Sequence, residues 1–218
     1  IGIKETGILV SCSDYHIFYK MKKTRKQALE QYLSVIRDCL EIGISPRCHL
    51  EDITRADFYG FVVPFCSELM KLMDEYKIPI KIRACDTMGY GVNFAGAVIP
   101  RSVQGTIYGL IKHAGVPSEM LEWHGHNDFY KAVTNSTTAW LYGACGVNCS
   151  LFGIGERTGN TPLEAMIFEY AQLRGNLNGA DTTVITEIAE YYQKELGYHI
   201  PEQTPFVGKN FNITRAGI

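Results

Sequence analysis

Short apolar segments alternate with longer amphipathic segments along most of this chain. The apolar segments predict β-strands at residues 8–12, 47–51, 78–85, 120–126 and 147–152. Apolar residues that recur every three to four positions predict helices at 24–42, 56–76, 130–143, 161–173 and 183–196, with another that ends near 115. Thr24 is the expected N-cap of the first helix, and Pro64 is expected to kink or divide the second.

Five strand–helix units in succession predict an α/β protein with a parallel sheet. An open doubly wound sheet and a (β/α)₈ barrel both fit. The barrel explains one more feature of the sequence. Unusual polar residues occur at the C-terminal ends of the predicted strands, and this is where the active sites of such barrels lie. Five units cannot close an eight-stranded barrel, so we predict its C-terminal portion, with about three units missing on the N-terminal side.

The predicted domain organisation has two parts. Residues 1–175 are expected to form the partial barrel, and residues 176–218 a linker helix and the beginning of a small C-terminal subdomain. The sequence begins at Ile1 without Met and reaches a strand almost at once, and it stops directly after Ala216-Gly217. Both ends look cut, which favours a fragment of a longer chain.

Two predicted strands alternate apolar and polar residues. The polar positions are Arg47, His49 and Glu51 in one strand and Lys81, Arg83 and Thr87 along the next. These polar faces are expected to converge on the barrel interior, where buried cations need partners, and Glu51 and Glu122 are available. An internal ion-pair network is the simpler interpretation. So many charges in one interior favour, by a modest margin, a site for an anionic ligand or a metal.

The segment 122–128 contains the most informative motif, His-x-His at the end of a buried strand. Strand side chains alternate between faces, so His124 and His126 are expected to point the same way. Two imidazoles at a strand's C-terminal end suit a divalent metal site. A pair of polar histidines with ordinary hydrogen bonds is the competing interpretation, and the motif by itself leaves the two about even.

Composition narrows the class of protein. The 218 residues are 46% hydrophobic and 20% charged, with a formal net charge of −2. The one basic run, at 20–26, is better explained as a solvated loop and first helical turn, so we expect neither nucleic acid nor a membrane as a partner. No apolar run is long enough to cross a bilayer, and seven scattered cysteines without Cys-x-x-Cys indicate reduced thiols and a cytoplasmic location.

A second motif follows the His-x-His segment after one strand–helix unit. It is Gly153-Ile154-Gly155-Glu156-Arg157-Thr158-Gly159-Asn160. Its glycine spacing is one residue too long for a dinucleotide loop, and we interpret it as a tight loop that delivers Asn160 toward the site. Together with residues 124–128, it resembles the metal-dependent acyl-CoA condensing enzymes of the isopropylmalate synthase and homocitrate synthase family. Further matches are Glu51-Asp52, Asp86-Thr87-Met88-Gly89, and Pro205-Phe206-Val207-Gly208 with Ala216-Gly217.

The resemblance implies a role for each matching residue. His124 and His126 would ligate a divalent metal (Mn²⁺, Mg²⁺, Zn²⁺ or Co²⁺), with Asn160 as a further ligand. The other implied roles are Glu51 as a catalytic residue, Arg47, His49 and Thr87 as substrate-binding residues, and Gly153, Gly155, Glu156, Arg157 and Gly159 as the lining of an acyl-CoA pocket. The family's remaining metal ligand, its catalytic Arg and its general base are not found in this sequence.

The activity implied is a Claisen-type condensation of acetyl-CoA with a 2-oxo acid, with release of CoA, in a homodimer. The chain is most similar to the Re-face citrate synthase branch of the family. Arg47 matches the homocitrate synthases and predicts a dicarboxylic 2-oxo acid. His49 replaces a small hydroxyl residue and would shrink the pocket, which favours oxaloacetate, with citrate as the product.

Several other functions stay open on the sequence. Homocitrate synthase and 2-isopropylmalate synthase activities belong to the same family. A metal-dependent hydroxyacyl-CoA lyase would share the two histidines and the asparagine, but it would be expected to lack the segment 205–217. The last possibility is a barrel fragment that binds a metal or a partner and is not an enzyme.

Overall fold

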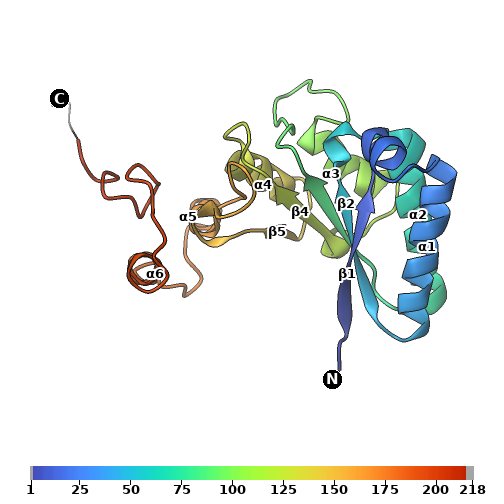
Figure 1. Ribbon diagram of the computed structural model, residues 1–218, viewed down its shortest axis with the longest axis horizontal. Helices are drawn as coiled ribbons and strands as arrows, with labels where there is room; N and C mark the ends of the chain where they lie inside the picture. Colours follow the sequence, from blue (N-terminus) through green and yellow to red (C-terminus); the bar gives the residue numbers. More distant parts are fainter. Residues whose placement is uncertain (1, 215–218) are drawn as a thin grey trace.

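In the computed structural model, which describes residues 2–214, five parallel strands form one sheet whose neighbours follow chain order (Figure 1). The strands are β1 (Glu5–Ser11), β2 (Ser45–Glu51), β3 (Lys81–Asp86), β4 (Leu121–Gly125) and β5 (Gly146–Asn148). The α-helices are α1 (Arg25–Glu41), α2 (Val63–Tyr76), α3 (Val103–Lys112), α4 (Ala132–Leu141), α5 (Leu163–Arg174) and α6 (Val184–Lys194). Short helical turns are η1 (Tyr15–Lys20), η2 (Ile53–Arg55), η3 (Phe58–Val62), η4 (Ser118–Met120) and η5 (Leu151–Gly153). The predicted succession of strand–helix units is confirmed.

The two faces of the sheet differ in polarity. In β2, Cys48 and Leu50 are fully buried, whereas Arg47, His49 and Glu51 are only partly buried. The buried residues join a core with the apolar faces of α1 and α2, which lie together along the sheet in Figure 1. Side chains alternate along a strand, so burial of one apolar face leaves the polar residues on the other. That polar face is the one predicted for the barrel interior.

Local sequence signals set two of the helix boundaries as predicted. The Thr24 side chain accepts a hydrogen bond from the Gln27 N–H, and the Gln27 side chain accepts one from the Thr24 N–H, which is a capping box. Such a cap stabilises a helix by about 1 kcal/mol. Pro64 lies in the first turn of α2, where its missing N–H is tolerated, and the π-helical turn η3 precedes it. The predicted helix is therefore divided at this proline.

Three strand boundaries differ from the prediction by three residues or more. β1 begins at Glu5, three residues early, and β3 begins at Lys81, three residues late. β5 ends at Asn148, four residues early, and Phe152, which the prediction placed in the strand, adopts a left-handed backbone (φ +56°) inside the turn η5. The Ser150 N–H bonds the Thr161 carbonyl, so this part of the chain pairs with the loop before α5 and does not extend the strand.

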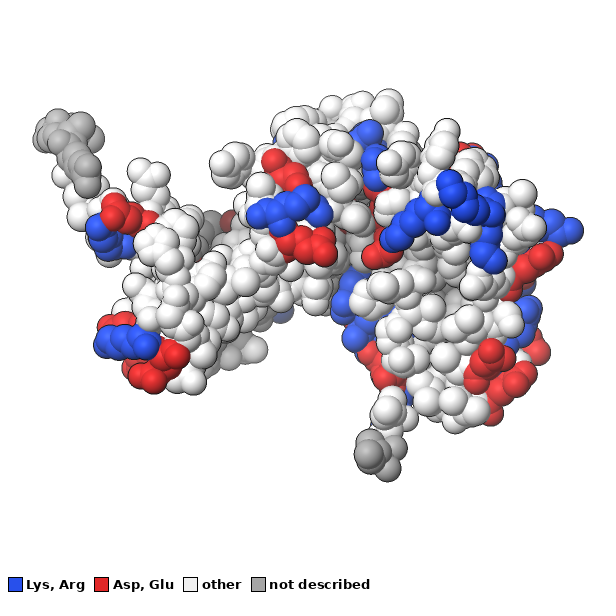
Figure 2. Space-filling model, viewed as in Figure 1, with Lys and Arg blue, Asp and Glu red and all other residues white. Residues whose placement is uncertain are grey.

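Charge is interspersed over the surface that Figure 2 shows, with one basic group over η1 and the start of α1. Lys20, Lys22 and Lys26 of the basic run are exposed, as expected for a solvated loop and first helical turn. All seven cysteines lie within residues 2–214 and none forms a disulfide. Among these residues, no helix has both the length and the apolar character that a membrane span requires.

The C-terminal part extends away from the sheet. Figure 1 shows α6 and the irregular segment after it beyond α5. The stacked rings of Phe168 and Phe206, 4.7 Å apart, connect that segment to α5. The predicted domain boundary at residue 175 stays a prediction. Ile1 and the predicted motif residues Ala216-Gly217 lie outside the described residues.

Candidate metal and substrate site

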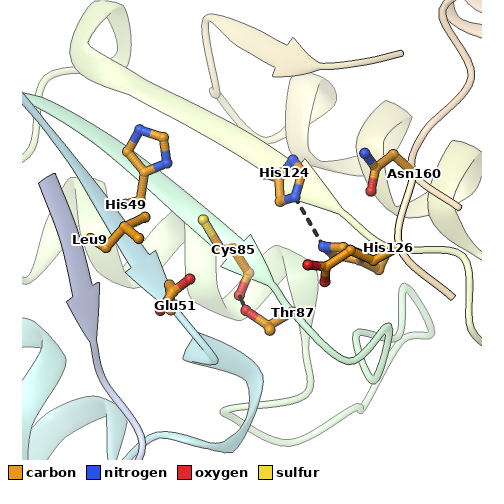
Figure 3. Close-up of a pocket in the computed structure, with 9 residues that line it drawn as sticks. Leu9, His49, Glu51, Cys85, Thr87, His124, His126 and Asn160 are labelled. Carbon is orange, nitrogen blue, oxygen red and sulfur yellow. Dashed lines mark hydrogen bonds between the residues drawn. The ribbon is translucent and has the colours of Figure 1, made fainter. Parts of the chain in front are cut away.

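A cavity of about 320 Å³ lies at the C-terminal ends of the strands (Figure 3). Its lining residues are Leu9, His49, Glu51, Cys85, Thr87, His124, His126, Glu156 and Asn160. The structure thus brings together seven residues that the sequence singled out. Leu9 and Cys85 were missed. Strand register was the available signal, because Leu9 pairs with His49 and Cys85 pairs with His124 on neighbouring strands.

The imidazole rings of His124 and His126, the two predicted metal ligands, lie close together in the cavity lining. Their Nε2 atoms are 3.1 Å apart, and their ring planes are nearly perpendicular. His124 Nδ1 lies 2.7 Å from Asn148 Oδ1, an oxygen that can only accept, so Nδ1 carries the proton and Nε2 presents a lone pair. Burial, reinforced by His126, lowers the pKa of His124 to about 4. Burial and the Arg157 charge lower the pKa of His126, so both rings are neutral at neutral pH.

These groups fit a divalent metal ion. At a separation of 3.1 Å, the two Nε2 atoms are close enough that they could bind one ion together. Asn160 Oδ1, in the same cavity lining, is buried without a hydrogen-bond partner among the described residues. Residues 2–214 contain no cluster of three or more His, Cys, Asp or Glu placed to hold a metal. The donor set they offer is two imidazoles and one amide oxygen, which suits Mn²⁺, Mg²⁺, Zn²⁺ or Co²⁺.

Asn148, which the sequence analysis missed, contacts the candidate metal site through His124. It pairs with His124 in the register of β4 and β5 and fixes the tautomer of that ring. We expect Asn148→Ala to lower Mn²⁺ affinity by about 10–100-fold, because the His124 ring loses the acceptor that orients it. Calorimetric titration of Mn²⁺ into the full-length protein measures this. Asn212→Ala, at an exposed position in the C-terminal segment, is the control, and equal affinities in the two variants would disprove the role.

The loop between β5 and α5 is shaped to carry Asn160 into the cavity. At Gly155, a Cβ would lie 2.6 Å from the Asn160 side-chain carbon, so only glycine leaves room for that amide. Gly159 has φ +99°, and a Cβ there would overlap the Gly153 carbonyl oxygen. The His126 and Asn160 backbones form an isolated bridge that brings the loop against the end of β4. The loop thus places Asn160 in the cavity lining, and its role as a metal ligand stays a prediction.

Charged residues form a layer below the cavity. Arg47 pairs with Glu5 (2.7 Å) and Glu122 (3.2 Å), Lys81 pairs with Glu5 (2.7 Å), and Arg83 pairs with Glu122 (2.7 Å). Glu122 was predicted as a partner. Three cations against two carboxylates leave one positive charge in excess, which favours an anion in the cavity above.

Two expectations about this layer change. Glu51 was named as one of two available partners for the cations, but among the described residues it forms no ion pair with them. It lies in the cavity lining, and Glu5, which the predicted first strand did not include, takes its place. Arg47 is not among the cavity-lining residues, so its role in substrate binding stays a prediction.

A second cavity, of about 410 Å³, lies on the other side of Asn160. Its walls include Phe152, Gly153 and Thr158 from the loop and Thr204, Pro205 and Phe206 from the C-terminal segment. Of the residues predicted to line an acyl-CoA pocket, Gly153 lines this cavity and Glu156 lines the first. Gly155, Arg157 and Gly159 are in the lining of neither, so their role in binding acyl-CoA stays a prediction.

The chain is similar to proteins of known family. The model of the HMGL-like family matches residues 2–191. A citrate (Re)-synthase from Clostridium kluyveri is 66% identical over 218 residues, which cover 100% of this chain and 48% of that protein. A citrate (Re)-synthase from Syntrophus aciditrophicus is 59% identical over 217 residues, which cover 100% of this chain and 34% of that protein. The chain thus spans about half or less of the length of these relatives.

Solved structures resemble the fold. Hydroxymethylglutaryl-CoA lyase from Pseudomonas aeruginosa superposes with a TM-score of 0.65 at 19% sequence identity, over 91% of this chain and 65% of that one. Similarity at this identity concerns the fold alone. With the five parallel strands and their helices, it confirms the predicted portion of a TIM barrel.

Proposed function

Because the chain belongs to the HMGL-like family, we propose that the full-length protein is a metal-dependent acyltransferase that condenses acetyl-CoA with a dicarboxylic 2-oxo acid. The 2-oxo acid is oxaloacetate, water hydrolyses the thioester of the condensation product, and the final products are citrate and CoA. The observation that carries the proposal is the meeting of two neutral imidazoles and the Asn160 amide oxygen in one cavity. The high identity to two citrate (Re)-synthases supports the choice of reaction.

Each cavity residue has a role in this reaction. His124, His126 and Asn160 hold the divalent metal, which when bound supplies Lewis-acid polarisation of a ketone carbonyl. The Thr87 hydroxyl donates a hydrogen bond to the carboxylate next to that carbonyl. Glu51 has a carboxylate without an ion-pair partner among residues 2–214, and it assists removal of a proton from the acetyl methyl group.

In our proposal, a dicarboxylate is recognised by His49 and by the layer of charged residues below the cavity. Burial, reinforced by Arg83 and Arg47, lowers the pKa of His49, which is therefore a neutral hydrogen-bonding wall that shortens the space for substrate. The excess positive charge of the layer below favours a second carboxylate, and our proposal assigns the binding of that carboxylate to Arg47. The acyl-CoA approaches along the 153–159 loop and the second cavity beside Asn160. A cytoplasmic homodimer remains our expectation.

The test is direct. The full-length protein, freed of metal and then supplied with Mn²⁺, is mixed with acetyl-CoA and one 2-oxo acid at a time. A thiol reagent reports CoA release, and mass spectrometry identifies the product. We expect citrate from oxaloacetate, loss of activity on chelation, and recovery when Mn²⁺ returns.

Other outcomes would reject the proposal in distinct ways. Formation of 2-isopropylmalate without citrate would show that the dicarboxylate assignment is wrong. Formation of homocitrate from 2-oxoglutarate, with oxaloacetate inert, would show that His49 does not shorten the cavity enough to select the smaller 2-oxo acid. Cleavage of a hydroxyacyl-CoA without condensation would make the protein a lyase.

A further inference from the structure

The Arg157 side chain joins three loops around the cavity. Its Nε donates to Asp128 Oδ1 at 2.8 Å, and its Nη2 donates to Asp128 Oδ2 at 3.0 Å. The same Nη2 donates to the Thr87 carbonyl oxygen at 2.6 Å. Thr87 follows β3, Asp128 follows β4, and Arg157 lies between β5 and α5. A single planar guanidinium therefore connects the ends of three neighbouring strands.

Each of these attachments adjoins a residue of the candidate site. Thr87 lines the cavity, Asp128 follows His126 by two residues, and Arg157 precedes Asn160 by three. Backbone bonds already join the β4 and β5 loops, because the Asn127 N–H donates to the Gly159 carbonyl at 2.9 Å. Arg157 adds a side-chain connection from these loops to the Thr87 peptide.

Thr87 is held from its other side by Asp52. The Asp52 N–H donates to Thr87 Oγ1 at 2.8 Å, from a left-handed backbone (φ +63°) that is unusual for a residue with a side chain. The buried Asp52 carboxylate is bound by Ser13 and Arg55, which keeps this conformation in place. Because Oγ1 accepts this bond, the Thr87 hydroxyl hydrogen is free to be donated. Its one recorded acceptor, the Cys85 carbonyl, is distant at 3.4 Å.

We propose that Arg157, oriented by Asp128, is a positioning residue that fixes Thr87 and the Asn160 loop for binding of the 2-oxo acid. This inference rests on the function proposed above. It replaces the expectation that Arg157 binds acyl-CoA, because the guanidinium is already engaged by Asp128, by the Thr87 carbonyl and, at 3.3 Å, by Glu156. Arg157 itself has φ +54°, so the loop holds it in a conformation that costs backbone energy.

The matched control is Arg25, whose guanidinium also binds one carboxylate through two nitrogens. Its Nε and Nη2 lie 2.7 and 2.6 Å from the Asp14 oxygens, and its side chain is 35% exposed against 36% for Arg157. Arg25 has no recorded contact with a cavity-lining residue in residues 2–214. Loss of either partly exposed pair should change the free energy of unfolding little. A difference in hydrogen exchange or in KM between Arg157→Ala and Arg25→Ala is then due to the location of Arg157 beside the cavity. It is not due to the loss of a positive charge or of stability, which the two variants share.

Two measurements on the full-length protein decide the matter. Hydrogen exchange followed by mass spectrometry should be faster at residues 86–91 and 153–160 in Arg157→Ala, and unchanged there in Arg25→Ala. In steady-state kinetics with Mn²⁺, Arg157→Ala should raise the KM for oxaloacetate by about tenfold or more and leave the KM for acetyl-CoA unchanged. Added guanidinium ion should lower the raised KM, and Arg157→Lys, which cannot reach both partners at once, should behave as an intermediate.

The possible results separate this inference from the proposed function. Unchanged exchange at residues 86–91 would overturn the positioning role whatever the substrate is. A raised KM for acetyl-CoA alone would overturn it as well and make Arg157 a contact of the acyl-CoA. Faster exchange in Arg157→Ala, in a protein whose wild type makes no citrate, would support the positioning role and reject the function.

Discussion

Replacement of His126 by alanine is expected to abolish metal-dependent condensation. The variant loses one of the two imidazoles whose Nε2 atoms meet at 3.1 Å, and His124 with Asn160 would have to hold the ion without it. Loss of a metal ligand should weaken metal binding more than loss of Asn148, which only orients a ligand. We therefore expect Mn²⁺ affinity to fall by more than about 100-fold. Activity should fall by at least about 10³-fold, which corresponds to about 4 kcal/mol in the activation barrier.

Titration calorimetry with Mn²⁺ and the CoA-release assay measure these two effects independently. His113→Ala is the control, because His113 is an exposed histidine at the end of α3 that contacts Tyr59 and Tyr108. It should bind Mn²⁺ like the wild type. Wild-type Mn²⁺ affinity in His126→Ala would show that the facing imidazoles are an ordinary hydrogen-bonded pair, and the proposed metal site would have to be abandoned.

Trp123→Ala is expected to produce the largest loss of stability. Trp123 lies in β4 between Glu122 and His124, points to the opposite face, and is fully buried in the core. Truncation of so large a side chain removes its contacts and leaves a cavity, which typically costs about 3–5 kcal/mol in the free energy of unfolding. Urea denaturation followed by circular dichroism measures the change.

Two further variants make the test specific. Trp140→Ala truncates the other tryptophan, which is only partly buried on α4, and should cost less than half as much. Trp123→Phe should also cost less than Trp123→Ala, because it keeps an aromatic ring and removes an indole N–H that is buried without a partner among the described residues. Equal losses for Trp123→Ala and Trp140→Ala would contradict the view that the strand carrying the histidines is anchored by the core behind it.

Contacts between neighbouring strands are the part of the site that the sequence predicts least well. The alternation of one strand was enough to predict that His124 and His126 share a face. It could not identify Asn148, which belongs to the next strand and reaches His124 through the sheet register. Glu5 was missed for a related reason, because the predicted first strand began three residues too late to include it. Its pairing with Arg47 and Lys81 leaves Glu51 in the cavity lining.

The order of strands and helices, the polar face of the sheet and most of the cavity residues were determined by the sequence, because these follow from periods of two and 3.6 residues and from caps and turns that act within a few residues. Tertiary structure decided which polar groups pair with which. Arg157 bonds Asp128 and the Thr87 carbonyl, and the Asp52 N–H bonds the Thr87 hydroxyl. These contacts join residues that lie 29 to 70 positions apart in the sequence. Such contacts depend on strand register and loop conformation, which are set by packing of the whole sheet and not by any one segment.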